Sequence, residues 1–161
     1  MRKNFVGMML LAASALVASV PVLAADELNL TNGYSAAGAP LAIHGYDPVS
    51  YFTDAAPALG DDSITVVHDG AAYRFSSQKH AEMFKKNPSR YVPQFGGYCA
   101  FGVSVGKKFD GDPRLWTVHE DKLYLNLNSE IQNMFSKDVA GAVKKANKNW
   151  VEIRHKSVSS L

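Results

Sequence analysis

The stretch Ile64-Thr65-Val66-Val67-His68-Asp69-Gly70-Ala71-Ala72-Tyr73-Arg74-Phe75 decides the fold of this chain. Two runs of β-forming residues, 64–68 and 72–75, flank its central Asp-Gly pair. An Asp-Gly pair between two such runs is a strong signal for a β-hairpin, because both residues tolerate the left-handed conformation of a tight turn. The stretch therefore predicts an antiparallel hairpin.

The same reasoning extends outward along the chain. A second hairpin is predicted from 115–118 and 122–125, around the turn His119-Glu120-Asp121. Capping residues and apolar spacing predict helices over 78–86, 129–135 and 139–151. Val49-Ser50-Tyr51-Phe52 predicts a short strand, and 100–105 fits either a helical turn or a buried strand.

Tight turns rather than long crossovers join the predicted strands, so the sheet is antiparallel. The expected fold is α+β, with a small antiparallel sheet of hairpins and helices packed on one side. No internal repeat and no domain break are evident in the sequence. Asp47, which precedes Pro48, is expected to form a turn in which its carboxylate accepts backbone amides.

The amino terminus has the pattern of a secretory signal peptide. Two cations, Arg2 and Lys3, precede an apolar run over 5–20, and small residues follow that fit cleavage after Ala24 or Ala25. The expected organisation is a signal peptide at 1–24, a flexible linker at 25–43, a single domain at 44–152 and a frayed tail at 153–161. This predicts a periplasmic or secreted protein with no membrane anchor after cleavage.

Charge adds a constraint on partners. Removal of 1–24 takes away two basic residues and no acidic one, which leaves 15 basic and 15 acidic side chains. A balanced chain gives no reason to expect nucleic acid as a partner. A metal ion or another exported protein remains as the expected partner, and the oligomeric state is left open.

The chain has one cysteine, Cys99, within Pro93-Gln94-Phe95-Gly96-Gly97-Tyr98-Cys99-Ala100-Phe101-Gly102. The two glycines predict a sharp turn that presents Tyr98 and Cys99 in a fixed place. Exported proteins usually pair their cysteines in disulfides, which a lone cysteine cannot do within one chain. Cys99 is therefore buried and inert, bound to a metal, reactive, or linked to another molecule.

Four segments in order, 45–52, 73–77, 84–91 and 96–100, resemble the YHS domain family and in particular its exported bacterial members. The resemblance covers about 44–100, and the hairpin of Trp116 and the helix of Trp150 are similar to the extension that exported members carry. It implies a compact metal-binding module, with copper favoured. Metal-binding members have cysteines where this chain has Ser50 and Ser76, whereas Cys99 matches the cysteine of the exported subgroup.

The candidate metal ligands are Cys99, His44 and His80, because copper and zinc bind thiolate and imidazole. His80 lies three residues before Met83 on a predicted helix, and His44 can meet Cys99 if their two turns converge. Tyr46, Asp47 and Tyr98 are candidates for a pocket beside these ligands.

We therefore expect an exported binding module rather than an enzyme, with copper or zinc as its possible cofactor. Two alternatives remain: a structural or interaction protein with an inert buried Cys99, and a thiol redox protein. Gly102-Val103-Ser104-Val105-Gly106 matches the nucleophile elbow of hydrolases, but a fold built of hairpins lacks the large parallel sheet that this elbow requires.

Overall fold

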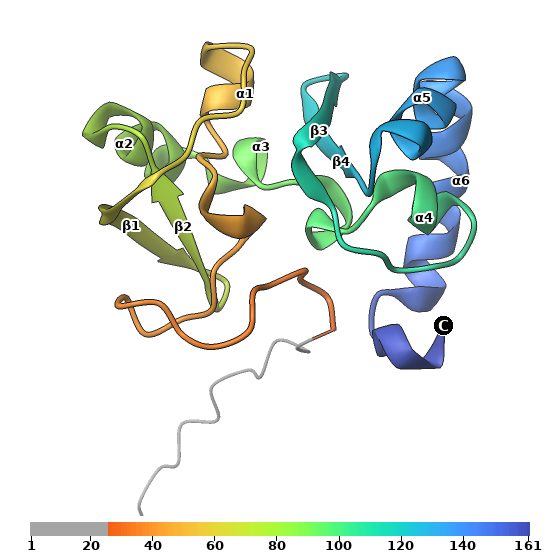
Figure 1. Ribbon diagram of the computed structural model, residues 1–161, viewed down its shortest axis with the longest axis horizontal. Helices are drawn as coiled ribbons and strands as arrows, with labels where there is room; N and C mark the ends of the chain where they lie inside the picture. The colour runs from red at the N-terminus through yellow and green to blue at the C-terminus, as the bar shows by residue number, and fades with distance from the viewer. Residues whose placement is uncertain (1–25) are drawn as a thin grey trace, which may run out of the picture.

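The computed structural model describes residues 26–161, and the predicted signal peptide lies outside this range. The α+β class is confirmed, with two separate two-stranded antiparallel sheets. Figure 1 shows two halves side by side, each made of one hairpin and its helices, with α3 (Pro88–Tyr91) between them. None of the helices in the described part of the chain is long and apolar enough to cross a membrane.

The first half contains the predicted hairpin and the predicted helix that follows it. After a 3₁₀ turn, η1 (Ile43–Gly45), come α1 (Ser50–Thr53), β1 (Asp61–His68), β2 (Ala71–Phe75) and α2 (Gln78–Lys86). The Ser77 hydroxyl accepts a hydrogen bond from the His80 amide and so caps α2, which decides between Ser76 and Ser77, the two caps that the sequence allows.

The second half has the same succession of elements. The turn η2 (Gln94–Gly97) leads to α4 (Ala100–Ser104), β3 (Asp112–His119), β4 (Lys122–Asn126), α5 (Ser129–Lys137) and α6 (Val139–Ile153). The short turn η3 (Val158–Ser160) follows α6. Of the two structures expected for 100–105, the helical turn is the one formed.

The second half is a structural repeat of the first, which corrects the expectation that the chain has no internal repeat. The elements β3, β4 and α5 each begin 51 residues after β1, β2 and α2. Both hairpins shift register at the same place, between Asp61 and Thr65 and between Asp112 and Trp116. The identical residues at this spacing include Gly60 and Gly111, Asp61 and Asp112, Val67 and Val118, His68 and His119, Tyr73 and Tyr124, Met83 and Met134, Phe84 and Phe135, and Lys86 and Lys137.

The predicted strand at 49–52 is wrong, because this segment enters α1. The Asp47 carboxylate accepts a hydrogen bond from the Val49 amide at 2.8 Å, and the Ser50 hydroxyl donates to the Asp47 carbonyl at 2.8 Å. These bonds wind the chain into a helical turn. Local side-chain bonds have overridden the β preference of the valine and the aromatic residues.

The strand β4 joins the two halves, because its side chains alternate between two hydrophobic clusters. Leu123 and Leu125 belong to the cluster of the first half, with Phe75 and Phe84. Tyr124, between them, belongs to the cluster of the second half. One strand therefore supplies both cores.

The segment predicted as a flexible linker makes backbone contacts with the rest of the described chain, and most residues of the predicted frayed tail are exposed. In the linker, Leu30 forms a β-bridge with Ala42, and Leu41 forms another with Ala72. In the tail, His155 Nδ1 lies 2.6 Å from Glu27 Oε1.

Lys108 holds these two segments together. Its side chain is 2 % exposed, and its Nζ donates to the carbonyls of Asp26, Arg154 and Lys156 at 2.6, 2.7 and 2.7 Å. Three carbonyl acceptors replace the water that burial removes from the ammonium group. Lys108 thereby caps the end of α6 and fixes the start of the described chain beside it.

Candidate functional site

Cys99 lies at the start of α4, where the glycine turn leaves it, as the sequence predicts. Gly96 and Gly97 have φ values of 63° and 85°, the left-handed region that favours glycine. A Cβ on Gly96 would lie 1.9 Å from the Glu27 carbonyl oxygen, so the close approach of the two backbones also requires glycine.

The Cys99 side chain is 1 % exposed and unpaired. Its Sγ accepts a hydrogen bond from the Gly102 amide at 3.3 Å and lies 3.7 Å from Asn126 Oδ1, to which the thiol can donate. Burial raises the pKa of the Cys99 thiol, and backbone amides that donate to the sulfur oppose this shift only in part. The thiol is therefore protonated at neutral pH.

Cys99 lines a cavity of about 120 Å³. The other walls of this cavity, which we call the thiol pocket, come from Phe101, Gly102, Val105, Phe109, Leu127 and Ile131. Val105, Phe109 and Leu127 are 58 %, 45 % and 37 % exposed, so the rim of the pocket is apolar and open to water.

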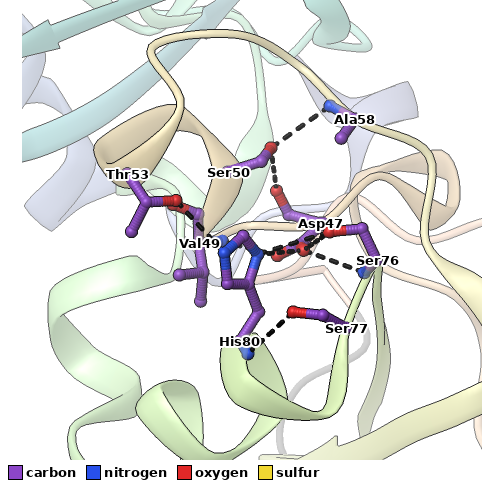
Figure 2. A network of polar contacts seen from close by, with 8 residues as sticks. All are labelled: Asp47, Val49, Ser50, Thr53, Ala58, Ser76, Ser77 and His80. Carbon is purple, nitrogen blue, oxygen red and sulfur yellow. Dashed lines mark hydrogen bonds and ion pairs between the residues drawn. The ribbon is translucent and has the colours of Figure 1, made fainter.

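The corresponding place in the first half is filled by a polar network around Asp47 (Figure 2). Asp47 is fully buried, and its Oδ2 accepts hydrogen bonds from His80 Nδ1 at 2.6 Å, the Ser76 hydroxyl at 2.7 Å and the Ser76 amide at 2.9 Å. His80 Nε2 lies 3.3 Å from the Thr53 hydroxyl. Figure 2 shows the imidazole ring between Asp47 and Thr53.

The repeat makes the two places comparable, although Asp47 and Cys99 are 52 residues apart rather than 51. Asp47 and Cys99 each follow a Gly-Tyr pair, and each accepts an amide from the chain after the second strand of its hairpin, Ser76 in one half and Leu127 in the other. His80 is the third residue of α2, and Ile131 is the third residue of α5. The imidazole covers the carboxylate in the first half, whereas in the second half the isoleucine forms one wall of an open pocket.

A second cavity, of about 330 Å³, lies beside the thiol pocket and shares Leu127 with it. We call it the polar cleft. His44, Tyr46, Asp110, Asp112, Pro113 and Arg114 form its other walls. His44 Nε2 lies 2.8 Å from Asp110 Oδ1, and the His44 backbone has a φ of 49°, an uncommon conformation for histidine.

The three predicted metal ligands lie in three different environments. Cys99 lines the thiol pocket, His44 pairs with Asp110 in the polar cleft, and His80 pairs with Asp47. Met83 packs against the first hydrophobic cluster. Within residues 26–161 there is no group of three or more His, Cys, Asp or Glu side chains that could hold a metal ion. The predicted donors therefore do not fit a single metal site.

The predicted pocket residues are also divided between separate places. Tyr46 lines the polar cleft, and Asp47 is the centre of the buried network. The Tyr98 hydroxyl donates to the Leu28 carbonyl at 3.3 Å, and its ring lies 5.2 Å from Lys108 Nζ.

Comparison with known proteins found no relative of this chain. No family model matches this chain, and no curated protein or solved structure matches it. The resemblance to the YHS domain family stays a prediction that rests on the four sequence segments.

Sequence reasoning missed three residues that build the candidate site. Asn126 is fully buried behind Cys99, Ile131 lines the thiol pocket, and Asp110 anchors His44. The stronger signal in the sequence is the 51-residue spacing, which aligns Ile131 with His80 and could have pointed to Ile131. A polar residue within the apolar run 123–127 is a weaker signal for Asn126.

Proposed function

We propose that this protein is an exported, non-enzymatic binding module whose ligand enters the thiol pocket. The observation that carries the proposal is the cavity itself: a buried thiol at a site with carbon walls and an exposed apolar rim. The equivalent position in the first half is filled by the imidazole of His80. The fold therefore does not require a cavity at this position. Apolar surface gathered around a concavity is characteristic of ligand sites.

The raised pKa of Cys99 argues against thiol redox chemistry, since the thiolate is the reactive form. An inert buried cysteine is the remaining alternative. It explains the low exposure of the side chain, but it gives no reason for the exposed rim of Val105, Phe109 and Leu127.

Thiol reagents of two sizes distinguish a Cys99 that lines an open pocket from a Cys99 that is buried and inert. Methyl methanethiosulfonate is small and neutral, and we expect it to modify Cys99 in the native protein. Dithiobis-nitrobenzoate is bulky and doubly charged, and we expect it to react only after unfolding. If neither reagent reacts before unfolding, Cys99 is inert and the proposal fails.

Gly102→Ala tests the shape of the pocket without changing the thiol. A Cβ at Gly102 would lie 2.8 Å from Phe109 Cδ2, so the Phe109 ring must shift, and 3.6 Å from Cys99 Cβ, so the added methyl group narrows the approach to the thiol. We expect native modification by the small reagent to slow at least tenfold. Ser104→Ala, on the same helix but outside the pocket walls, is the matched control and leaves the rate unchanged.

Copper or zinc is the second candidate ligand, with Cys99 as its soft donor. One titration compares wild type with Cys99→Ala, His44→Ala and His80→Ala. Uptake that is lost only in Cys99→Ala supports a metal in the thiol pocket. Equal weak uptake by wild type and Cys99→Ala rejects metal binding there.

Export is part of the same proposal and rests on residues 1–24. Protein recovered from the exported fraction of cells that express the full chain should begin at Ala25 or Asp26 by intact mass. A full-length mass in that fraction contradicts cleavage.

A further inference from the structure

We propose that the ligand of the thiol pocket is amphipathic, with a short hydrocarbon part over Cys99 and an ammonium head at Asp110 in the polar cleft. This inference rests on the proposed function and specifies the chemical class of the ligand. Three observations carry it: the lining residue that the two cavities share, the size of the apolar cavity, and the charge left over in the polar one.

The two cavities share one lining residue. Leu127 lines both of them. Phe109 lines the thiol pocket, and the next residue, Asp110, lines the polar cleft. A molecule that lies across Leu127 therefore contacts carbon on one side and charged side chains on the other.

The thiol pocket limits the size of the hydrocarbon part. Its volume is about 120 Å³, somewhat less than an engineered protein cavity of about 150 Å³ that holds benzene. A chain of about four to six carbons suits this space. The polar cleft, at about 330 Å³, has room for a head group.

The charges of the polar cleft do not balance. Arg114 donates from Nε and Nη2 to the two carboxylate oxygens of Asp112, at 3.0 and 2.7 Å, and so neutralises that side chain. Asp110 has no guanidinium partner. Its Oδ1 accepts hydrogen bonds from Asn29 Nδ2 at 2.6 Å and from His44 Nε2 at 2.8 Å. When the imidazole is neutral, both donors are neutral and the cleft keeps one negative charge.

This residual charge selects the head group. An ammonium ion compensates Asp110 and can donate a hydrogen bond to it, whereas a carboxylate is repelled and an alcohol gains no charge interaction. The ligand class is therefore a short alkylammonium compound rather than a fatty acid or an alcohol.

The test uses hexylammonium, hexan-1-ol and hexanoate as probes at pH 8, where histidine is ordinarily neutral. Binding is followed by NMR from the amide shifts of Phe101, Leu127 and Asp110. We expect hexylammonium to bind about fivefold more tightly than hexanol, as for a partly exposed ion pair, and hexanoate to bind most weakly.

Asp110→Asn keeps an oxygen for His44 and Asn29 but removes the charge. We expect this variant to bind hexylammonium and hexanol equally. Asp69→Asn removes one charge at the turn between β1 and β2, outside the walls of either cavity, and serves as the matched control that keeps the fivefold preference.

The outcomes separate the two proposals. If no probe shifts the amides around Cys99, the proposed function fails and this inference fails with it. If hexanol or hexanoate binds as tightly as hexylammonium to the wild type, the thiol pocket stands as a binding site and the ammonium head is wrong. If Asp69→Asn loses the preference as Asp110→Asn does, the selectivity comes from net charge and not from Asp110.

Discussion

At the scale of single residues, Asp47 carries the heaviest structural role in the first half. Its buried carboxylate accepts four hydrogen bonds, from the Val49 and Ser76 amides, the Ser76 hydroxyl and His80 Nδ1. Asp47→Ala leaves these donors without a partner, and a buried donor left unsatisfied costs about 1–3 kcal/mol. We expect a loss of that size in the free energy of unfolding, measured with urea.

Asp54→Ala, an exposed aspartate at the end of α1, is the control for Asp47→Ala and should cost under about 0.5 kcal/mol. A loss below about 1 kcal/mol for Asp47→Ala would mean that water satisfies the stranded donors.

Cys99 predicts how stability depends on pH. Burial raises the pKa of the thiol in the folded state, so the unfolded chain loses this proton first as pH rises. The contribution of the thiol is complete below its unfolded pKa of about 8.5 and is lost as pH rises through the higher folded value.

The measurement compares wild type with Cys99→Ala, which cancels the titration of all other groups. The difference in their unfolding free energies should stay constant from about pH 6 to pH 8, and should change in favour of the variant as pH rises above about 8.5. A constant difference over the whole range would show that the folded thiol has an ordinary pKa.

Sequence reasoning reached part of this chemistry. It predicted that Asp47 accepts backbone amides, and the bond from Val49 confirms it. It did not predict the pairing with His80, because the two residues are 33 positions apart and only the packing of α2 brings them together. It placed Cys99 on a glycine turn, but the walls of the thiol pocket come from two helices, α4 and α5, and from the segments before β3 and after β4.

At the scale of elements, Lys108 decides how the end of α6 is held. Its ammonium group donates to Asp26, Arg154 and Lys156, and burial lowers its pKa because the charged form is poorly solvated. Lys108→Met keeps the aliphatic length but removes all three hydrogen bonds. We expect a loss of roughly 3 kcal/mol in stability, with amide exchange quickening first at 26–30 and 153–161.

Lys107→Met is the matched control, because the neighbouring side chain is exposed. It should change neither stability nor exchange. Uniform exchange changes over the whole molecule in Lys108→Met would show that the lysine supports the global core rather than these two segments.

Elements with strong local signals were predictable. The Asp-Gly turn and the Ser77 cap give the first hairpin and α2, and these are confirmed. Residues 49–52 were not predictable in this way, because the helical turn depends on hydrogen bonds that the Val49 amide and the Ser50 hydroxyl donate to Asp47, and these compete with β propensity. The repeat was missed because few of the residues 51 positions apart are identical.

At the scale of the whole molecule, β4 couples the two halves through Leu123, Tyr124 and Leu125. The chain provides a reporter for each core: Trp116 packs against the first cluster and Trp150 against the second. In Trp150→Phe the remaining fluorescence follows the first core, and in Trp116→Phe it follows the second.

Because one strand belongs to both cores, we expect each variant to unfold in a single transition, with its fluorescence midpoint coinciding with its own midpoint from circular dichroism. Leu125→Ala should lower both midpoints together, since a buried leucine truncated to alanine costs about 2–5 kcal/mol. Separate midpoints, or a loss confined to one reporter, would mean that the halves unfold independently.

The 51-residue repeat has a consequence for how far the two sites can differ. The two halves offer equivalent positions, and these differ in what fills them: Asp47 and His80 close the first, whereas Cys99 and Ile131 line a cavity in the second. Because β4 ties both cores together within one chain, the two positions need not be identical for the fold to close. A substitution that reshapes one position therefore leaves the side chains of the other untouched.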